Sequence, residues 1–118
     1  MKLFEVVPGE LFSPLASPNR ALYADALDVL YTAYRENLKI REDMLYSMLR
    51  SRMEQQLADA TFEGEDIDED ELRDISGRAR FLIRKLCGKG WFEKERGDDF
   101  EEYITVPSYS SRLLELFH

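Results

Sequence analysis

The chain has 118 residues, of which 44% are hydrophobic and 34% are charged, and its formal net charge is −8 at pH 7. Seven Phe, six Tyr and one Trp are enough for the core of a single domain, a single Cys excludes an internal disulfide, and no apolar run approaches the roughly 18 residues of a membrane span. We therefore expect one cytoplasmic domain over residues 1–118 that has no membrane partner and whose acidic charge disfavours nucleic acid.

Residues 1–17 are predicted to form an N-terminal arm. The arm is rich in apolar side chains, but Pro8, Gly9 and Pro14 interrupt any regular period. Two interpretations stay open at this point. Either the arm packs on its own domain, or it covers a partner, because exposed apolar clusters tend to be interfaces.

Two helices are predicted to follow, over residues 18–36 and 42–60. Ser17 suits the N-cap of the first helix, and Pro18 suits its first helical position, where a missing N–H costs nothing. Apolar side chains recur at helical spacing in both segments, so one face of each helix is expected to be buried. The connector between them contains two residues placed for a brief strand, Leu38 and Ile40.

Residues 62–71 carry seven acids and no base, and the repulsion between like charges predicts a loop. The alternating aspartates resemble the start of a calcium-binding EF-hand loop. Counting from Asp66, however, such a loop needs glycine where Glu71 stands and a bidentate acid where Gly77 stands. We therefore expect no metal site here.

A third helix is predicted over residues 71–88, and a wing hairpin over residues 91–106 follows it. Gly88 and Gly90 lie just past the last periodic apolar residue of the helix, where a left-handed cap favours glycine. The second strand of the hairpin is predicted over residues 100–106, which are aromatic and β-branched.

A further helix is predicted to start at residue 108 and to continue to residue 118 without a cap, so we expect the chain to be the N-terminal fragment of a longer protein. The order of elements predicts a mainly α fold with a small β-ribbon, namely a winged helix-turn-helix.

Charge is distributed unevenly over this fold. Residues 72–90 hold six basic residues against one acid, whereas the hairpin from Glu93 to Glu102 holds two basic residues against six acids. An acidic wing repels the phosphates that a DNA-reading wing contacts. Two interpretations of the arginines in the third helix stay open. Either they pair with the acidic loop, with acids of another subunit or with water, or they contact phosphate. The candidates for DNA contact are Arg73, Arg80, Arg84 and Lys85.

No motif for catalysis or cofactor binding is recognisable. The only GxG, at residues 88–90, follows a helix instead of opening one, so it does not match a phosphate-binding loop. One His and one Cys are too few for zinc chemistry or for a Cys–His nucleophile. We expect neither enzymatic activity nor a cofactor.

Three stretches resemble the N-terminal region of the JetA family, the kleisin-like, MukF-related subunits of the Wadjet systems that defend bacteria against plasmids and phage: LFEVVPGELFSPLASPNRALYADALDVLY, DISGRARFLIRKLCGKGWFE and FEEYITVPSYSSRLLELF. The resemblance implies a condensin-related complex in which the full-length chain bridges an SMC-type ATPase and recruits a small accessory subunit. It also implies that this domain forms a homodimer, has no ATPase or nuclease activity of its own, and meets DNA only indirectly or weakly.

The surplus of apolar residues on the arm, the ribbon and the last helix agrees with a dimerisation domain. The residues that we expect at the interface are Phe4, Val6, Leu11, Phe12, Trp91, Phe92, Tyr103, Leu114 and Phe117. The alternative function is a DNA-binding winged helix, a transcriptional regulator or another DNA-contacting module, that uses the basic third helix.

Overall fold

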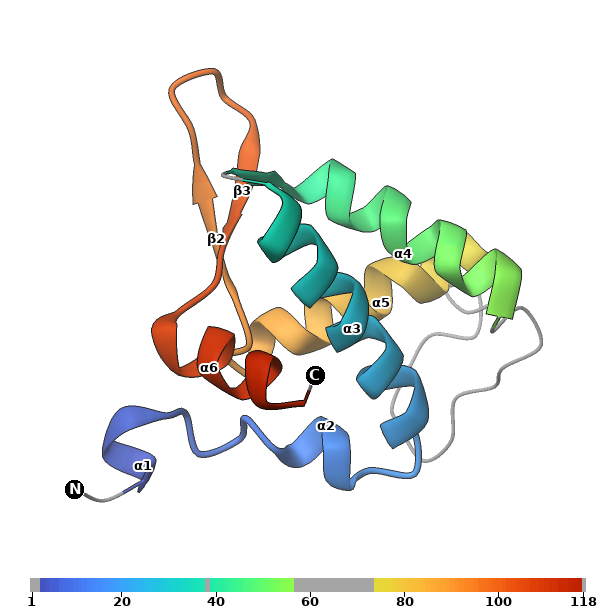
Figure 1. Cartoon of the computed structure of the whole chain (residues 1–118). Helices are drawn as coiled ribbons and strands as arrows, with labels where there is room; N and C mark the ends of the chain where they lie inside the picture. The colour runs from blue at the N-terminus through green and yellow to red at the C-terminus, as the bar shows by residue number, and fades with distance from the viewer. Residues whose placement is uncertain (1–2, 38, 57–73, 118) are drawn as a thin grey trace.

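The structure of the protein is a computed structural model that describes residues 3–37, 39–56 and 74–117 (Figure 1). It is mainly helical, with a small three-stranded antiparallel sheet. The predicted acidic loop over residues 62–71 lies outside the described residues, as does Arg73. Within the described part of the chain, no helix has both the length and the apolar character that crossing a membrane requires.

The arm contains two short helices that the sequence did not predict, α1 (Leu3–Val6) and α2 (Ser13–Ala16). Ser17 is the C-cap residue of α2, and its hydroxyl both donates to the Pro14 carbonyl oxygen at 2.8 Å and accepts the Asn19 N–H of the following turn at 3.2 Å. The next helix, α3 (Arg20–Glu36), therefore begins two residues later than predicted, after a turn in which the Arg20 N–H bonds to the Ser17 carbonyl.

Two further helices, α4 (Glu42–Gln56) and α5 (Ile75–Gly88), pack against α3 and against each other. The start of α4 agrees with the prediction, whereas its predicted end at residue 60 lies outside the described residues. Asp74 caps α5, because its carboxylate accepts the Gly77 N–H at 2.7 Å. The α3–α4 contact includes the Arg52 guanidinium, which lies 2.9 Å from Asp25 and 3.0 Å from Asp28.

Helix α5 ends in a Schellman motif around Gly90. The N–H groups of Gly90 and Trp91 bond to the carbonyl oxygens of Cys87 and Leu86 at 3.1 and 3.0 Å. Gly90 has φ +97°, a conformation that glycine adopts readily. The prediction of a left-handed glycine cap is thus confirmed for Gly90, while Gly88 remains the last residue of the helix.

The sheet consists of β1 (Ile40–Arg41), β2 (Glu93–Arg96) and β3 (Glu102–Thr105) in the order β1-β3-β2. The brief strand predicted at Ile40 is therefore present. Ile40 pairs with Ile104 of β3, and Lys94 of β2 pairs with the other side of Ile104. The β2–β3 hairpin projects away from the helices (Figure 1).

The last helix, α6 (Ser108–Leu116), packs against α3 and contributes the buried Leu114 side chain to the core. The Tyr109 hydroxyl donates to the Gly90 carbonyl oxygen at 2.7 Å, which ties α6 to the end of α5. The Trp91 ring is fully buried, and its Nε1–H donates to the carbonyl oxygen of Leu11 at 2.7 Å. This hydrogen bond joins the arm to the rest of the domain across 80 residues of sequence.

Candidate protein interfaces

Four residues that the sequence placed at the interface are instead part of the protomer's own core. They are Leu11, Trp91, Phe92 and Leu114, each no more than 1% exposed. The Schellman turn directs the chain under the helices immediately after α5, so both aromatic rings of the ribbon's first residues point inward. The prediction that these four residues lie at an interface is therefore wrong, because their side chains have no exposed area that a partner could contact.

Three other residues predicted at the interface on the arm and at the end of α6, namely Val6, Phe12 and Phe117, are at least partly on the surface. Phe117 is 53% exposed and Leu116 is 77% exposed at the end of α6, while Phe12 is half-buried. A groove of about 360 Å³ between α2, α3 and α6 is lined mainly by Leu15, Ala24, Leu27, Leu114 and Phe117, so the arm and the end of α6 lie side by side. We call the exposed Leu3, Val6, Leu116 and Phe117, together with the half-buried Phe12, the arm–α6 face. The side chain of Phe4 lies outside what the structure describes.

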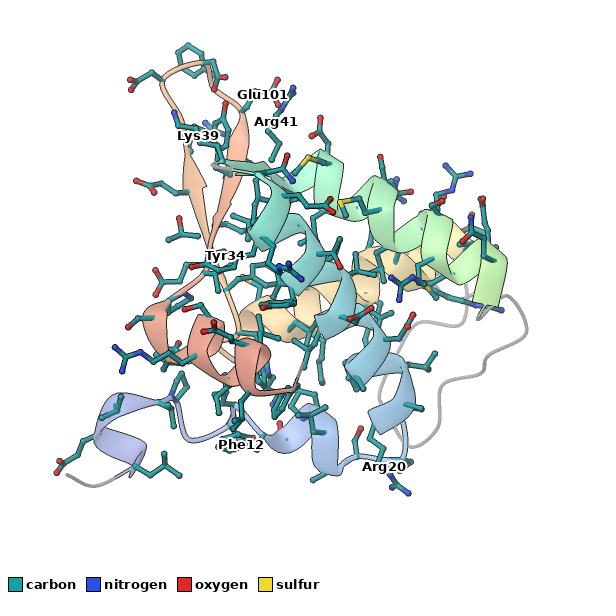
Figure 2. All side chains as sticks on the ribbon, viewed as in Figure 1. Phe12, Arg20, Tyr34, Lys39, Arg41 and Glu101 are labelled. Atoms are coloured by element: carbon teal, nitrogen blue, oxygen red, sulfur yellow. The ribbon has the colours of Figure 1, made fainter. Side chains whose placement is uncertain are left out.

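Tyr103 is not part of this face. It lies on β3 in the hairpin, and Figure 2 shows Phe12 near the opposite end of the molecule from Glu101, which precedes β3. The Tyr103 hydroxyl donates to Asp99 at 2.7 Å, and the Lys39 ammonium lies 5.5 Å from the centroid of its ring. The structure therefore separates Tyr103 from the arm and α6 residues with which the sequence had grouped it.

The basic residues of α5 do not form a uniform positive surface. The Arg80 guanidinium lies 5.0 Å from the centroid of the Tyr46 ring, and the Arg84 guanidinium and the Lys85 ammonium lie 5.6 and 6.0 Å from that of Phe81. Arg80 and Arg84 do line one groove, of about 360 Å³. The other residues lining this groove are Glu42, Asp43, Tyr46, Ile83 and Lys94. Because two acids stand beside the arginines, the groove is less favourable for phosphate than the sequence of α5 alone indicates.

The exposed edge of the sheet carries a charge at every position. β2 is an edge strand, and all four of its residues, Glu93, Lys94, Glu95 and Arg96, are exposed. Successive side chains point to opposite faces, so the two glutamates share one face and the two basic residues share the other.

This pattern opposes pairing between the β2 strands of two copies. A two-fold axis that joins antiparallel edge strands is perpendicular to the sheet, so each residue faces a partner from the same face of the other copy. Every such register brings like charges opposite one another: glutamate faces glutamate, or Lys94 or Arg96 faces itself or the other. Like charges in this position are destabilising. The charges of β2 therefore disfavour a dimer that is formed through this edge.

The hairpin tip holds an exposed aromatic residue that the sequence analysis misplaced. Phe100 was predicted to begin the second strand, but the strand begins at Glu102, and the Phe100 N–H instead closes a turn on the Gly97 carbonyl oxygen at 3.1 Å. Phe100 is 81% exposed and has φ +65°. The preceding Gly-Asp-Asp run is the sequence signal that could have extended the predicted turn by one residue.

A hydrogen bond between Asp99 and Tyr103 makes the hairpin tip sensitive to pH. The Tyr103 hydroxyl and then the Glu101 N–H lower the pKa of Asp99 below 3.8, and the bond to Asp99 raises the pKa of Tyr103 above 10.0. The carboxylate's contribution is present above pH 3.8 and is lost as pH falls through its lowered pKa. The hydroxyl's contribution is present below pH 10.0 and is lost as pH rises through its raised pKa.

We therefore expect the backbone amides of the tip to keep constant NMR shifts from about pH 5 to pH 9 and to change outside that range. In Tyr103→Phe, the change at high pH should disappear, and the acid titration of Asp99 should move up toward its ordinary pKa. An acid titration of Asp99 that is identical in both proteins would contradict the assigned hydrogen bond.

A family model described as Wadjet protein JetA matches residues 29–118 of the chain. The chain belongs to the JetA family. The Wadjet protein JetA of Bacillus cereus (strain Q1) is 37% identical to this chain over an alignment 118 residues long. The alignment covers 96% of this chain and 25% of the Bacillus protein, so the chain spans about a quarter of its relative's length. The JetA family model begins inside α3, whereas the alignment with the Bacillus protein covers nearly the whole chain. No solved structure matches.

Proposed function

We propose that this chain is a non-catalytic protein-interaction domain of the Wadjet system, and that it holds two JetA chains together through the arm–α6 face. The observation that carries the proposal is the exposure of Leu116 and Phe117 beside an arm with further exposed apolar residues. Apolar surface gathered in this way is typical of protein contacts. The family match supports the assignment to the Wadjet system.

The fold that we propose is a winged helix-turn-helix. In support, α3, β1, α4, α5, β2 and β3 follow one another in the order of that fold, and the hairpin occupies the place of its wing. In a DNA-reading member, α5 would be the recognition helix. Here the wing is acidic and the long helices carry their apolar faces inward, so most of the exposed large apolar side chains lie on the arm and at the end of α6.

In the complete assembly, we propose a kleisin-like scaffold. The JetA chain would bridge an SMC-type ATPase and recruit a small accessory subunit through segments beyond these 118 residues, in a cytoplasmic complex that acts against plasmids and other foreign DNA. The support for this role is the resemblance to JetA across nearly the whole chain. Within the described residues, no three acidic, His or Cys side chains are grouped as metal ligands.

A dimer of this kind has a definite size requirement. A two-fold interface uses the same patch on both copies, and a stable one buries more than about 1,000 Å² in total. Aromatic anchors near its centre contribute most of the binding energy. Phe12 and Phe117 are the aromatic members of the arm–α6 face and are the best candidates for this role.

The test is the mass of the chain in solution as a function of concentration. We expect the unaltered chain to sediment as a dimer and Phe12→Glu/Phe117→Glu to sediment as a monomer, with a dissociation constant raised by more than about 100-fold if each anchor loses about tenfold or more. Because Phe12 is half-buried, a second variant, Leu116→Glu/Phe117→Glu, alters exposed residues only.

Phe100→Glu is the matched control, because it makes the same chemical change at the other end of the molecule and should leave the dimer intact. Circular dichroism on each variant verifies that the helices remain. The proposal fails if the unaltered chain is a strict monomer at high concentration, and the arm–α6 face is wrong if the dimer survives both double variants.

DNA binding through α5 is the second candidate, because Arg80 and Arg84 are both exposed and share one groove. Against it stand Glu42 and Asp43 in that groove and the acidic wing. Tight binding to duplex DNA at low salt, lost in Arg80→Glu/Arg84→Glu, would favour this candidate over dimerisation as the principal role of the domain.

A further inference from the structure

The tip of the β2–β3 hairpin presents a single large apolar side chain to solvent. Phe100 is 81% exposed, and its backbone has φ +65°. A bulky residue is unfavourable in this left-handed conformation, which glycine and asparagine adopt more easily. Both exposure and conformation therefore make phenylalanine a poor choice for stability at this position. Residues held in such conformations are concentrated at functional sites.

The hairpin holds this ring on a well-defined loop. The Gly97 N–H bonds to the Glu101 carbonyl oxygen at 2.8 Å, and the Phe100 N–H bonds back to Gly97 at 3.1 Å. Asp99 accepts the Tyr103 hydroxyl at 2.7 Å and the Glu101 N–H at 3.1 Å. These bonds fix the backbone on both sides of the ring. The backbone around Phe100 would therefore lose little conformational freedom when the ring binds a partner.

A further ion pair joins the loop to the sheet. The Arg41 guanidinium of β1 lies 3.0 Å from the Glu101 carboxylate, and Figure 2 shows the two side chains meeting beside the hairpin. Gly97 allows the Tyr103 ring to approach closely, since a Cβ on Gly97 would lie 2.5 Å from that ring. The tip is thus supported from β1 as well as from within the hairpin.

The charge around the ring indicates what kind of surface it fits. Asp98, Asp99 and Glu101 flank Phe100, and the loop from Gly97 to Glu101 contains no basic residue. Arg41 offsets only one of these carboxylates directly. Nucleic acid and a second acidic hairpin are both repelled by such a tip, whereas a surface with lysines or arginines around an apolar pocket complements it.

We propose that the hairpin tip, Phe100 with its flanking carboxylates, docks into an apolar pocket rimmed by basic residues on another protein of the Wadjet system. The proposal rests on the proposed role as a protein-interaction domain, but it uses the end of the molecule opposite the arm–α6 face. One domain would in this way hold a second copy of itself at one end and a different protein at the other. A second copy does offer Arg80, Arg84 and Lys94 around Tyr46, but Glu42 and Asp43 line that same groove, and Glu42 lies 3.0 Å from Lys94.

The first experiment is a crosslink from the tip. The chain carrying Phe100→p-benzoylphenylalanine is irradiated together with the other Wadjet proteins, each purified separately, and the product is located by mass spectrometry. We expect one dominant product, on a different Wadjet protein, at a site where Lys or Arg surround apolar residues. Its yield should fall in the presence of Asp98→Lys, which reverses a charge beside the ring. Crosslinks to a second copy, to nucleic acid or to scattered sites would each overturn the proposal. The absence of any crosslinked product would overturn it as well.

The second experiment separates binding from folding. Phe100→Gly removes the ring and the strained conformation together, so its thermal midpoint should stay the same or rise while its affinity for the crosslinked protein falls by about tenfold or more. Phe100→Tyr retains a ring and should bind within a few-fold of the unaltered chain. Equal affinity of the glycine variant and the unaltered chain would refute the anchor.

Sedimentation of the same Phe100 variants distinguishes this proposal from the dimer. If the variants remain dimeric but lose the second partner, both proposals hold. If dimerisation fails in the unaltered chain while the tip still crosslinks, only the arm–α6 face is lost.

Discussion

Replacing Trp91 with phenylalanine is expected to lower the free energy of unfolding by about 2–4 kcal/mol. The indole is fully buried, and its N–H is bonded to the Leu11 carbonyl oxygen at 2.7 Å. Phenylalanine removes the donor, which leaves a buried carbonyl without that partner, and it also leaves space that the core fills only in part. Urea unfolding followed by circular dichroism measures the loss.

The same substitution should loosen the arm before it unfolds the helices. Hydrogen exchange at the arm amides should become faster, because the bond from Trp91 to Leu11 is one of the contacts that hold the arm on the core. Substituting Trp91 with benzothienylalanine keeps the shape of the ring but has no N–H, so it should show only the hydrogen-bond part of the loss, about 1–3 kcal/mol. An unchanged urea midpoint in the phenylalanine variant would contradict this account of the arm.

Replacing Gly90 with alanine is expected to destabilise the domain by about 2–3 kcal/mol. Two causes act together. The backbone at residue 90 has φ +97°, which is unfavourable for any residue with a Cβ, and the added Cβ would overlap the ring of Pro8 in the arm. A urea titration gives the size of the loss, and a faster exchange of the arm amides reveals the displaced arm.

Gly88→Ala is the matched control for this prediction. Gly88 is the last residue of α5, its added Cβ would have nothing within 4 Å, and alanine has the higher helix propensity, so we expect no loss or a gain of up to about 1 kcal/mol. In a Pro8→Gly background, the part of the Gly90→Ala loss that comes from the overlap should disappear. Equal effects of the two alanine substitutions would show that neither the turn nor the arm contact restrains residue 90.

The elements of this fold were largely predictable from local sequence patterns. The apolar periodicity of α3, α4 and α5, the brief strand at Ile40, and the glycine that ends α5 each follow from rules that act over a few residues. The start of α3 was misjudged because Ser17 suits two roles equally, the N-cap of one helix and the end of another. Local patterns do not choose between such alternatives.

The location of the surface was much harder to predict. Trp91, Phe92 and Tyr103 look alike in the sequence as aromatic residues of one ribbon, yet the structure buries the first two and leaves Tyr103 on the hairpin. The indole N–H of Trp91 bonds to the carbonyl oxygen of Leu11, which is 80 positions away in the sequence. Burial depends on contacts of this range, and strand alternation alone does not determine it. For the same reason, the prominence of Phe100 became visible only when the turn was placed.

The charges along β2 also limit how large an assembly of this chain can grow. Proteins with bare sheet edges risk adding copy after copy into fibrils, since each new strand creates the next template. Here the alternation of Glu93, Lys94, Glu95 and Arg96 makes the first such addition between identical chains unfavourable. If two copies join through the arm–α6 face as proposed, these charges would oppose the addition of further copies along this sheet edge, even at high concentration.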